Sequence, residues 1–252
     1  MNRTLCLVLL LVLPSLLVSC SENESEPVSE FVGDWRHAGG DHSQAKYSPL
    51  DQINAENFGD LEIAWRWQSA DLRLPDGVGY ATADYRAVPL VVNGTMYVNS
   101  NHGVIAAIDP ATGEELWLFD PESYRYGSPI QTNIMIRGIE YWTDGDIERI
   151  FVATLGKQLL SLDVATGQPD PNFGEDGFID LSQNLGRLEF ESNFITAGAA
   201  PIAIGNSLII GSKIFDYGMY NRSPPGHVRA YDTYTGELKW RFNTIPQDGE
   251  YG

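Results

Sequence analysis

The chain has little cysteine and little basic charge, and each shortage excludes a class of protein. Its two cysteines, Cys6 and Cys20, both lie in the first 20 residues. The rest of the chain therefore has no thiol for a disulfide or a cysteine metal site. The 252 residues include 16 Lys and Arg against 34 Asp and Glu, a formal net charge of −18. Nucleic-acid binding is disfavoured because no Lys/Arg-rich run is present, and an ordinary solvated surface accounts for most of the acidic excess.

Long hydrophobic runs are also scarce, and the main one is N-terminal. Arg3 precedes an apolar segment, Leu5 to Val18, that is too short to span a bilayer comfortably and ends in Leu-Val-Ser-Cys20. This ending resembles a bacterial lipoprotein signal, in which Cys20 becomes the lipidated first residue. We expect a signal at 1–19, a polar tether at 20–32 and a periplasm-facing chain held by lipid at a bacterial membrane, with the outer membrane the expected one. A cleaved secretory signal is the alternative.

One eleven-residue frame, A-x-D-x-x-T-G-x-x-x-W, occurs twice, at 107–117 and 230–240. A degenerate copy at 161–167 has Pro171 where the tryptophan would fall. Self-similarity of this kind indicates stacked supersecondary units, none of which buries its apolar face alone.

The segments around each frame predict β-strands. β-branched and aromatic runs cover 90–98, 150–154 and 202–210, and Asn93-Gly94 and Gly205-Asn206 divide the first and third as tight turns. In each frame we expect the Asp to accept turn amides, the Gly to take a positive φ and the Trp to begin the next strand. The frame aspartates are 54 and 69 residues apart, which suits four-stranded blades. The sequence therefore predicts an all-β propeller, with a β-sandwich as the alternative.

Further motifs near the N-terminus carry a family resemblance. Gly33-Asp-Trp precedes Gly39-Gly-Asp, then Tyr47-Ser-Pro-Leu-Asp-Gln-Ile-Asn, and finally Asn57 to Trp65. From Gly33 to Gly252 the chain resembles the PQQ-dependent quinoprotein dehydrogenases, and the frame is similar to their tryptophan-docking motif. The resemblance implies an eight-bladed propeller with the quinone near its axis. That fold needs more than twice this length, so we expect a fragment holding roughly the first three blades. The resemblance also implies a strand at Gly59–Trp65 that helps to close the ring against a C-terminal segment not present in this chain.

Within this family, parts of the chain resemble the membrane-bound glucose and quinate dehydrogenase branch. The segments that carry this likeness are 161–181 and 224–232. The adjacent cysteine pair of the alcohol-oxidising branch is absent here, which agrees with the glucose-type branch.

The resemblance also implies cofactor contacts. Arg137 matches an arginine that meets a PQQ carboxylate, His102 a histidine at the quinone, and Ser212 a serine near a carboxylate. Asp216 matches a Ca²⁺ ligand and supplies only part of the shell, because Ca²⁺ takes six to eight oxygens. The alternatives are a surface ion pair for Arg137, a solvated turn for His102 and a simple turn around Asp216.

Two positions depart from the family pattern. Arg86 stands where many members have a cofactor-contacting Glu, and Gly198 stands where a Thr is common. Arg86 still suits an anionic cofactor, and Thr196 lies two residues from Gly198. We therefore include Arg86 and Thr196 among the expected PQQ contacts.

The implied activity is oxidation of an alcohol, sugar or polyol, with electrons passed to the respiratory chain. In the family, Ca²⁺ polarises the quinone and an Asp from a later blade accepts the hydroxyl proton. That base is expected beyond Gly252, so the fragment alone is expected to be inactive. The alternative is a non-catalytic propeller lipoprotein of the kind that scaffolds outer-membrane assembly. A scaffold does not need Arg137, His102 or Asp216.

Overall fold

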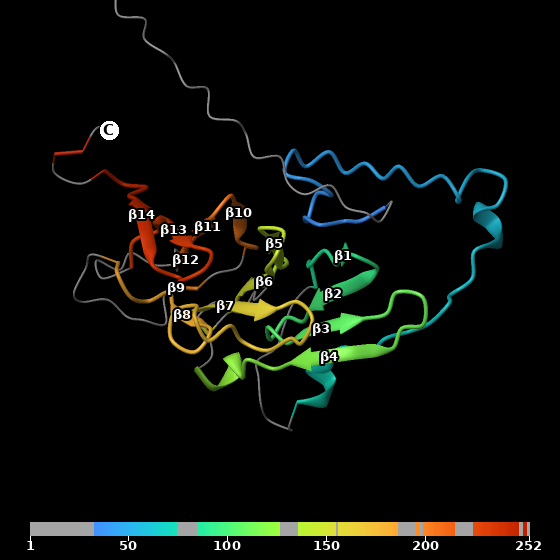
Figure 1. The fold of residues 1–252 in the computed structure, drawn as a ribbon, viewed down its shortest axis with the longest axis horizontal. Helices are drawn as coiled ribbons and strands as arrows, with labels where there is room; N and C mark the ends of the chain where they lie inside the picture. Colours follow the sequence, from blue (N-terminus) through green and yellow to red (C-terminus); the bar gives the residue numbers. More distant parts are fainter. Residues whose placement is uncertain are drawn as a thin grey trace, which may run out of the picture.

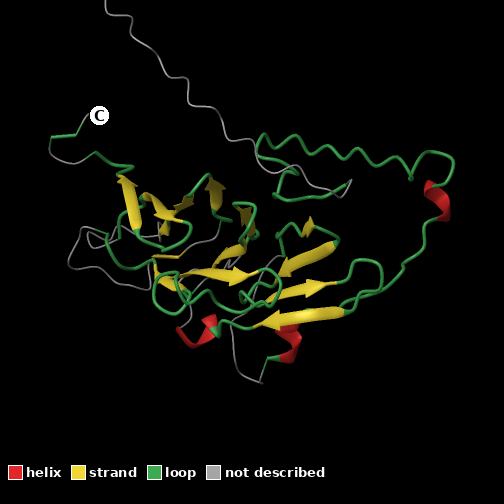
Figure 2. Cartoon of the chain, viewed as in Figure 1, coloured by secondary structure: helices red, strands yellow, loops and turns green. Residues whose placement is uncertain are grey.

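The fold consists of antiparallel sheets arranged side by side (Figures 1 and 2). The computed structural model describes residues 33–74, 85–126, 136–154, 156–185, 195–196, 199–214, 224–246 and 249–250. Three sheets have four strands each, and a small ladder has two. The helices described are short 3₁₀ turns, η1 (Phe58–Asp60), η2 (Ala70–Arg73) and η3 (Ser123–Tyr126). None of these helices has the length and apolar character needed to cross a membrane.

Each four-stranded sheet is a meander, or blade, in which neighbouring strands pair in an antiparallel way. Blade 1 comprises β1 (Leu90–Val92), β2 (Thr95–Asn99), β3 (Ile105–Ile108) and β4 (Glu115–Phe119). Blade 2 comprises β5 (Glu140–Thr143), β6 (Glu148–Ala153), β7 (Gln158–Asp163) and β8 (Phe178–Asp180). Blade 3 comprises β10 (Ile202–Ile204), β11 (Ser207–Gly211), β13 (Val228–Asp232) and β14 (Leu238–Phe242). The small ladder pairs β9 (Ile195–Thr196) with β12 (Lys213–Ile214). The prediction of three propeller-type blades is confirmed.

The predicted tight turns join the first two strands of blades 1 and 3. Asn93 and Gly94 have φ of 50° and 77°, and Val92 pairs with Thr95 across them. Two successive positive φ values match the twist of a hairpin, and asparagine and glycine tolerate them best. Gly205, with φ of 54°, serves the equivalent turn between β10 and β11.

The three frames form one type of turn at the end of the third strand of each blade. The Asp109 carboxylate accepts the amides of Ala111 and Thr112 at 2.7 and 3.2 Å. Asp163 and Asp232 make the same kind of contact with the amides that follow them. The frame glycines Gly113, Gly167 and Gly236 have φ of 77°, 68° and 72°. The turn chemistry inferred from the frame is therefore confirmed, whereas the tryptophans lie in the middle of β4 and β14 rather than at their start.

Tryptophans link each unit to the next. Trp65 donates its indole N–H to Pro110 O at 2.9 Å and lies over Gly113, where an added Cβ would be 2.7 Å from the ring. Trp117 likewise donates its indole N–H to Val164 O at 3.0 Å. It lies over Gly167, where an added Cβ would be 2.5 Å from the ring. Glycine is required at both positions because the ring occupies the space that a side chain would take.

Blade 2 interrupts this series. Pro171 replaces the tryptophan, and the outer strand β8 begins only at Phe178, after a compact loop. Ile179 of this strand takes over the docking role, because an added Cβ on Gly236 would lie 2.9 Å from its Cδ1. The degenerate frame therefore changes the docking side chain while the blade keeps four strands.

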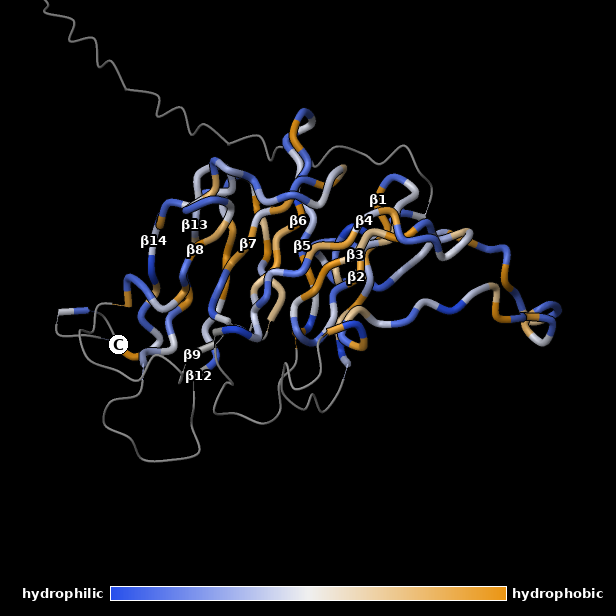
Figure 3. The backbone as a smooth tube through the Cα atoms, turned by 90° about the horizontal axis from the view of Figure 1, so that it is seen from below, coloured by the Kyte–Doolittle hydropathy of each residue, from blue (hydrophilic) through white to orange (hydrophobic). Residues whose placement is uncertain are grey.

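The strands are rich in hydrophobic residues, drawn in orange in Figure 3, and their buried side chains pack between neighbouring sheets. One cluster joins blades 1 and 2 and includes Leu90, Ile105, Ile150 and Leu160, all fully buried. A second joins blades 2 and 3 around Phe151, Phe173 and Leu208. This packing agrees with the repeat argument that no unit buries its apolar face alone.

The N-terminal part contains the stretch expected to help close the ring. Its pairing partner is expected in a segment that this chain does not contain, so the Gly59–Trp65 strand stays a prediction; among the described residues, η1 covers Phe58–Asp60 and Leu61 to Ser69 has no strand pairing. No described segment pairs with this stretch, so its backbone lacks the ladder that defines a strand. In Figure 1 this stretch belongs to a long arm, drawn in blue to cyan, that runs away from the sheets and returns beside β4.

Candidate functional site

The chain segments that carry the predicted cofactor contacts meet at one end of the blades. The first strand of each blade, β1, β5 or β10, begins at this end. We call these three the innermost strands and this end the entry end. Gly138 lies between the segments that precede β1 and β10, since an added Cβ would be 3.7 Å from Ala200 Cβ and 4.0 Å from Val88 O. An added Cβ on Gly103 would likewise lie 3.4 Å from Ile136 Cδ1. The segments containing Arg86, His102 and Arg137 are therefore neighbours in space.

Arg86 and Arg137 are both exposed at the entry end. Arg86 lies four residues before β1 and Arg137 three residues before β5, and Arg137 stands between the fully buried Ile136 and Ile139. These two buried isoleucines hold the backbone at Arg137 in place, so the position from which its side chain extends is fixed. A planar guanidinium with five donors suits a carboxylate better than an ammonium does.

His102 is almost completely buried in the loop between β2 and β3. Its Nδ1 lies 3.1 Å from Asp71 Oδ2, and its carbonyl oxygen accepts the Ser123 hydroxyl. Burial raises the pKa of the Asp71 carboxyl, but hydrogen bonds from the His102 and Ser100 side chains outweigh this and hold it below its usual 3.8. Asp71 therefore stays ionised at neutral pH and orients the imidazole. The solvated turn considered for this histidine is wrong.

Ser212 and Thr196 are brought together by the small ladder. Thr196 pairs with Lys213, the residue after Ser212, across β9 and β12. The Ser212 hydroxyl oxygen is buried and has no hydrogen-bond partner among the described residues. Asn99 Oδ1, just before the His102 loop, is in the same situation. Buried polar atoms of this kind commonly mark a place for a ligand or water.

Some predicted site residues lie outside the described residues. These are the expected calcium ligand Asp216 and the expected lipidation site Cys20; Gly198, which departs from the family pattern, also lies outside the described residues. Their roles stay predictions.

A groove of about 750 Å³ also opens between the outer parts of blades 1 and 2. Its lining includes Lys157 and five carboxylates, those of Asp120, Glu122, Glu175, Asp176 and Asp180. Burial lowers the pKa of Lys157, although Asp180 opposes this. We do not place an anionic cofactor here, because the carboxylates would repel it.

Asp71 and Asn99 were not found by sequence reasoning. Asp71 sits in η2, whose N-cap Ser69 accepts the Asp71 amide at 3.3 Å. Nothing in the local sequence indicates that this short helix meets the loop after β2. The contact arises only from the arm returning alongside blade 1.

The chain is similar to known quinone-dependent enzymes. The family model described as "PQQ: Glucose/ethanol/alcohol dehydrogenase, beta-propeller domain" matches residues 35–252. A quinohemoprotein alcohol dehydrogenase from Comamonas testosteroni is 33% identical over 216 residues, which cover 85% of this chain and 26% of that protein. Quinoprotein glucose dehydrogenase A from Acinetobacter calcoaceticus is 29% identical over 237 residues, which cover 85% of this chain and 28% of that protein.

Solved structures agree in fold. The crystal structure of the Comamonas testosteroni enzyme superposes with a TM-score of 0.63 at 32% identity, covering 85% of this chain and 28% of that one. A europium-containing methanol dehydrogenase superposes with a TM-score of 0.64 at 23% identity, covering 87% of this chain and 33% of that one. This likeness supports the fold alone. The chain therefore spans between a quarter and a third of the length of these relatives.

Proposed function

Because this chain belongs to the PQQ beta-propeller domain family of glucose, ethanol and alcohol dehydrogenases, we propose that its protein oxidises an alcohol, sugar or polyol with PQQ and Ca²⁺. Electrons then pass to an acceptor of the respiratory chain. In this proposal the described blades hold the cofactor, and the base that accepts the substrate's proton lies on another part of the protein.

The observation that supports this proposal most strongly is the convergence at the entry end. Gly138 lies against both Val88 and Ala200, so three innermost strands begin around one place. Two exposed arginines, a buried histidine and an unpartnered serine hydroxyl belong to the segments gathered there. A planar tricarboxylate needs this set of cations and donors.

The residues present fit PQQ in charge and hydrogen bonding. Arg86 and Arg137 would hold its carboxylates, the Ser212 hydroxyl would donate to one of them, and Thr196 would stand beside that contact. His102, oriented by Asp71, would meet the quinone, and Asp216 would contribute to the Ca²⁺ shell. When bound, PQQ supplies an ortho-quinone that accepts hydride and Ca²⁺ supplies a Lewis acid.

The activity is tested on the full-length protein. It would be titrated with PQQ in the presence of Ca²⁺ and assayed with an artificial electron acceptor across alcohols, aldoses and polyols. We expect saturable PQQ binding and oxidation of at least one of these substrate classes. Failure to bind PQQ would overturn the proposal and favour the scaffold.

Arg137→Ala tests the cofactor contact. Losing a charge-assisted hydrogen bond costs about 1.5–3 kcal/mol, so PQQ affinity should fall roughly ten- to a hundredfold. Arg66→Ala is the matched control, because Arg66 is also exposed but follows Trp65, which docks at the opposite, frame-turn end of blade 1. Equal affinities for the two variants would show that Arg137 has no part in binding.

We also propose that Cys20 anchors the protein by lipid at a bacterial membrane, facing the periplasm. The support is the Leu-Val-Ser-Cys sequence after an apolar segment and the polar tether that follows. Cells fed a labelled fatty acid should incorporate it into the wild-type protein but not into Cys20→Ser. A processed, unlabelled protein would support the cleaved secretory signal instead.

A further inference from the structure

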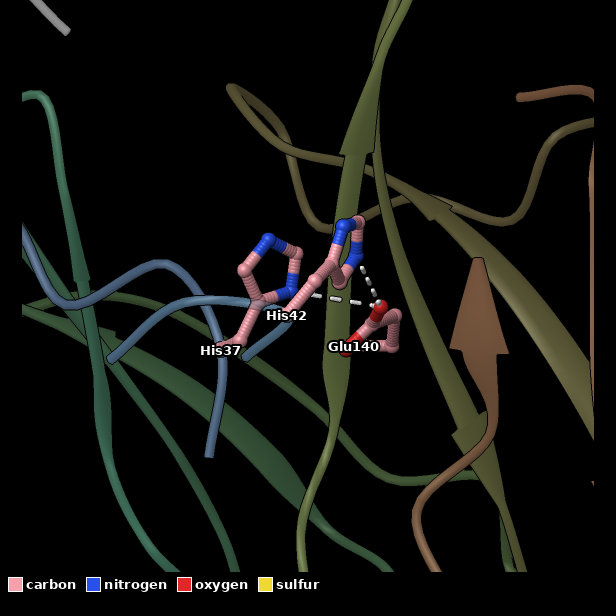
Figure 4. Close-up of side chains that lie close together, drawn as sticks. All are labelled: His37, His42 and Glu140. Atoms are coloured by element: carbon pink, nitrogen blue, oxygen red, sulfur yellow. Dashed lines mark ion pairs between the residues drawn. The ribbon is translucent and has the colours of Figure 1, made fainter. Parts of the chain in front are cut away.

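Two histidines and a glutamate meet where the N-terminal segment reaches the innermost strands. His37 Nδ1 lies 3.3 Å from Glu140 Oε1, and His42 Nε2 lies 3.8 Å from the same oxygen. The candidate ligand atoms of the three residues all lie within 4.8 Å of one another. Figure 4 shows both rings beside the carboxylate.

The local sequence explains how the two histidines come together. The segment His-Ala-Gly-Gly-Asp-His folds as a tight turn, in which the Gly40 amide donates to His37 O at 2.8 Å. Gly40 has φ of 89°, and an added Cβ would lie 3.3 Å from the Trp35 ring. Glycine therefore lets the chain reverse tightly, and the two imidazole rings lie with centroids 4.0 Å apart.

Glu140 is held in place by the neighbouring blade. It begins β5, is 4% exposed, and its Oε1 accepts the Ala203 amide of β10 at 2.9 Å. On the other side, Trp35 exchanges backbone hydrogen bonds with Val91 of β1 at 2.7 and 3.0 Å. The three side chains therefore sit where β1, β5 and β10 are tied together through the N-terminal segment.

We propose that His37, His42 and Glu140 bind a divalent transition metal, with Zn²⁺ as the reference ion. Tetrahedral zinc with bonds of about 2.0–2.1 Å places neighbouring ligand atoms roughly 3.3–3.5 Å apart, close to the separations found around Oε1. Two imidazoles and one carboxylate select zinc-like ions over Ca²⁺ and Mg²⁺, which prefer all-oxygen shells. Two ligands are buried and the His42 side chain is 36% exposed, so a fourth position opens toward solvent.

The Ala203 amide would support this site from outside the ligand set. It fixes the carboxylate through one oxygen and leaves further lone pairs for the metal. A bound ion would then join the N-terminal turn to blade 2 directly and to blade 3 through this hydrogen bond. The alternative is a simple contact between a carboxylate and two imidazoles, without metal.

The test uses tag-free, full-length protein that has been stripped of metal and then saturated with Ca²⁺. Zn²⁺ is titrated by competition with a chromogenic chelator, and Co²⁺ is added separately as a spectroscopic probe. We expect one tight Zn²⁺ site and the visible absorption of a low-symmetry Co²⁺ complex with nitrogen ligands. Absence of that absorption in the wild-type protein would overturn the proposal without any variant.

Variants then identify the ligands. His42→Ala and Glu140→Gln should each weaken Zn²⁺ binding at least about tenfold, since even outer-shell partners contribute that much. Asp41→Asn is the matched control, because it removes an exposed charge beside His42 and keeps an oxygen for the Ala45 amide. Near-ultraviolet circular dichroism checks the fold, and His42→Ala is the variant least able to disturb the interior. Unchanged affinity in His42→Ala, or an equal loss in Asp41→Asn, contradicts the proposal.

Discussion

Asp71 Oδ2 lies 3.1 Å from His102 Nδ1, which joins a short helix of the N-terminal arm to the loop between β2 and β3. The carboxylate and the imidazole are both largely shielded from water, with side-chain exposures of 18% and 9%. A buried carboxylate paired with a histidine fixes both the ring orientation and the protonated nitrogen. The arm therefore takes part in building the entry end.

Replacing Asp71 with Asn should weaken PQQ binding without abolishing it. The amide is similar in size but carries no charge to hold the His102 ring, so affinity should fall about five- to a hundredfold, the effect of about 1–3 kcal/mol. PQQ titration of the full-length protein measures this. Glu114→Gln removes an exposed carboxylate at the opposite end of blade 1 and should leave affinity unchanged. Equal affinity of Asp71→Asn and wild type would show that the pair does not serve the cofactor.

The same pair predicts an acid-dependent contribution to stability. The folded pKa of Asp71 lies below the ordinary 3.8, because its hydrogen bonds outweigh the effect of burial. Its stabilising effect is therefore fully present above pH 3.8 and is lost as the pH falls through the lower, folded value. Urea unfolding should show that Asp71→Asn destabilises the protein at neutral pH and that the difference shrinks in acid. A difference that is constant with pH would exclude this linkage.

The blades were predictable because the information for them is local and repeated. Asp109, Thr112 and Gly113 specify one turn through hydrogen bonds between residues close together in the sequence. The same frame occurs twice more, at Asp163 and at Asp232. The Gly59–Trp65 strand stays a prediction, because a strand depends on a pairing partner and the expected partner is not part of this chain.

The site was predictable only in part. Arg86, His102 and Arg137 could be placed at strand beginnings and loops from sequence order, and the structure brings these segments together. Asp71 and Glu140 could not be found, because each meets its histidine across a contact between distant segments. The only local signal for the proposed metal site is the pair of histidines, His37 and His42, on either side of Gly39 and Gly40. Tertiary contacts of this kind have no periodicity in the chain.

Gly167→Ala should destabilise the protein more than Gly205→Ala. Both glycines have positive φ, so both variants carry backbone strain of about 1–2 kcal/mol. At Gly167 the new methyl would also lie 2.5 Å from the Trp117 ring, whereas nothing lies within 4 Å at Gly205. Overpacking should add about 1–3 kcal/mol. Chemical denaturation of the two variants isolates the tryptophan contact, and equal losses would show that the ring simply moves away.

Trp240 gives the complementary prediction, because it is the frame tryptophan with no glycine under it among the described residues. It is 42% exposed, and every residue of β14 is exposed, whereas Trp117 packs on the next blade. In the 252-residue chain, Trp240→Ala should change stability by less than about 0.5 kcal/mol, while Trp117→Ala should cost about 3–5 kcal/mol. In the full-length protein, the proposed further blades would give both substitutions a similar cost. Urea midpoints for both variants in both lengths check this, and a Trp240→Ala variant that is neutral in the full-length protein would show that no further blade docks on β14.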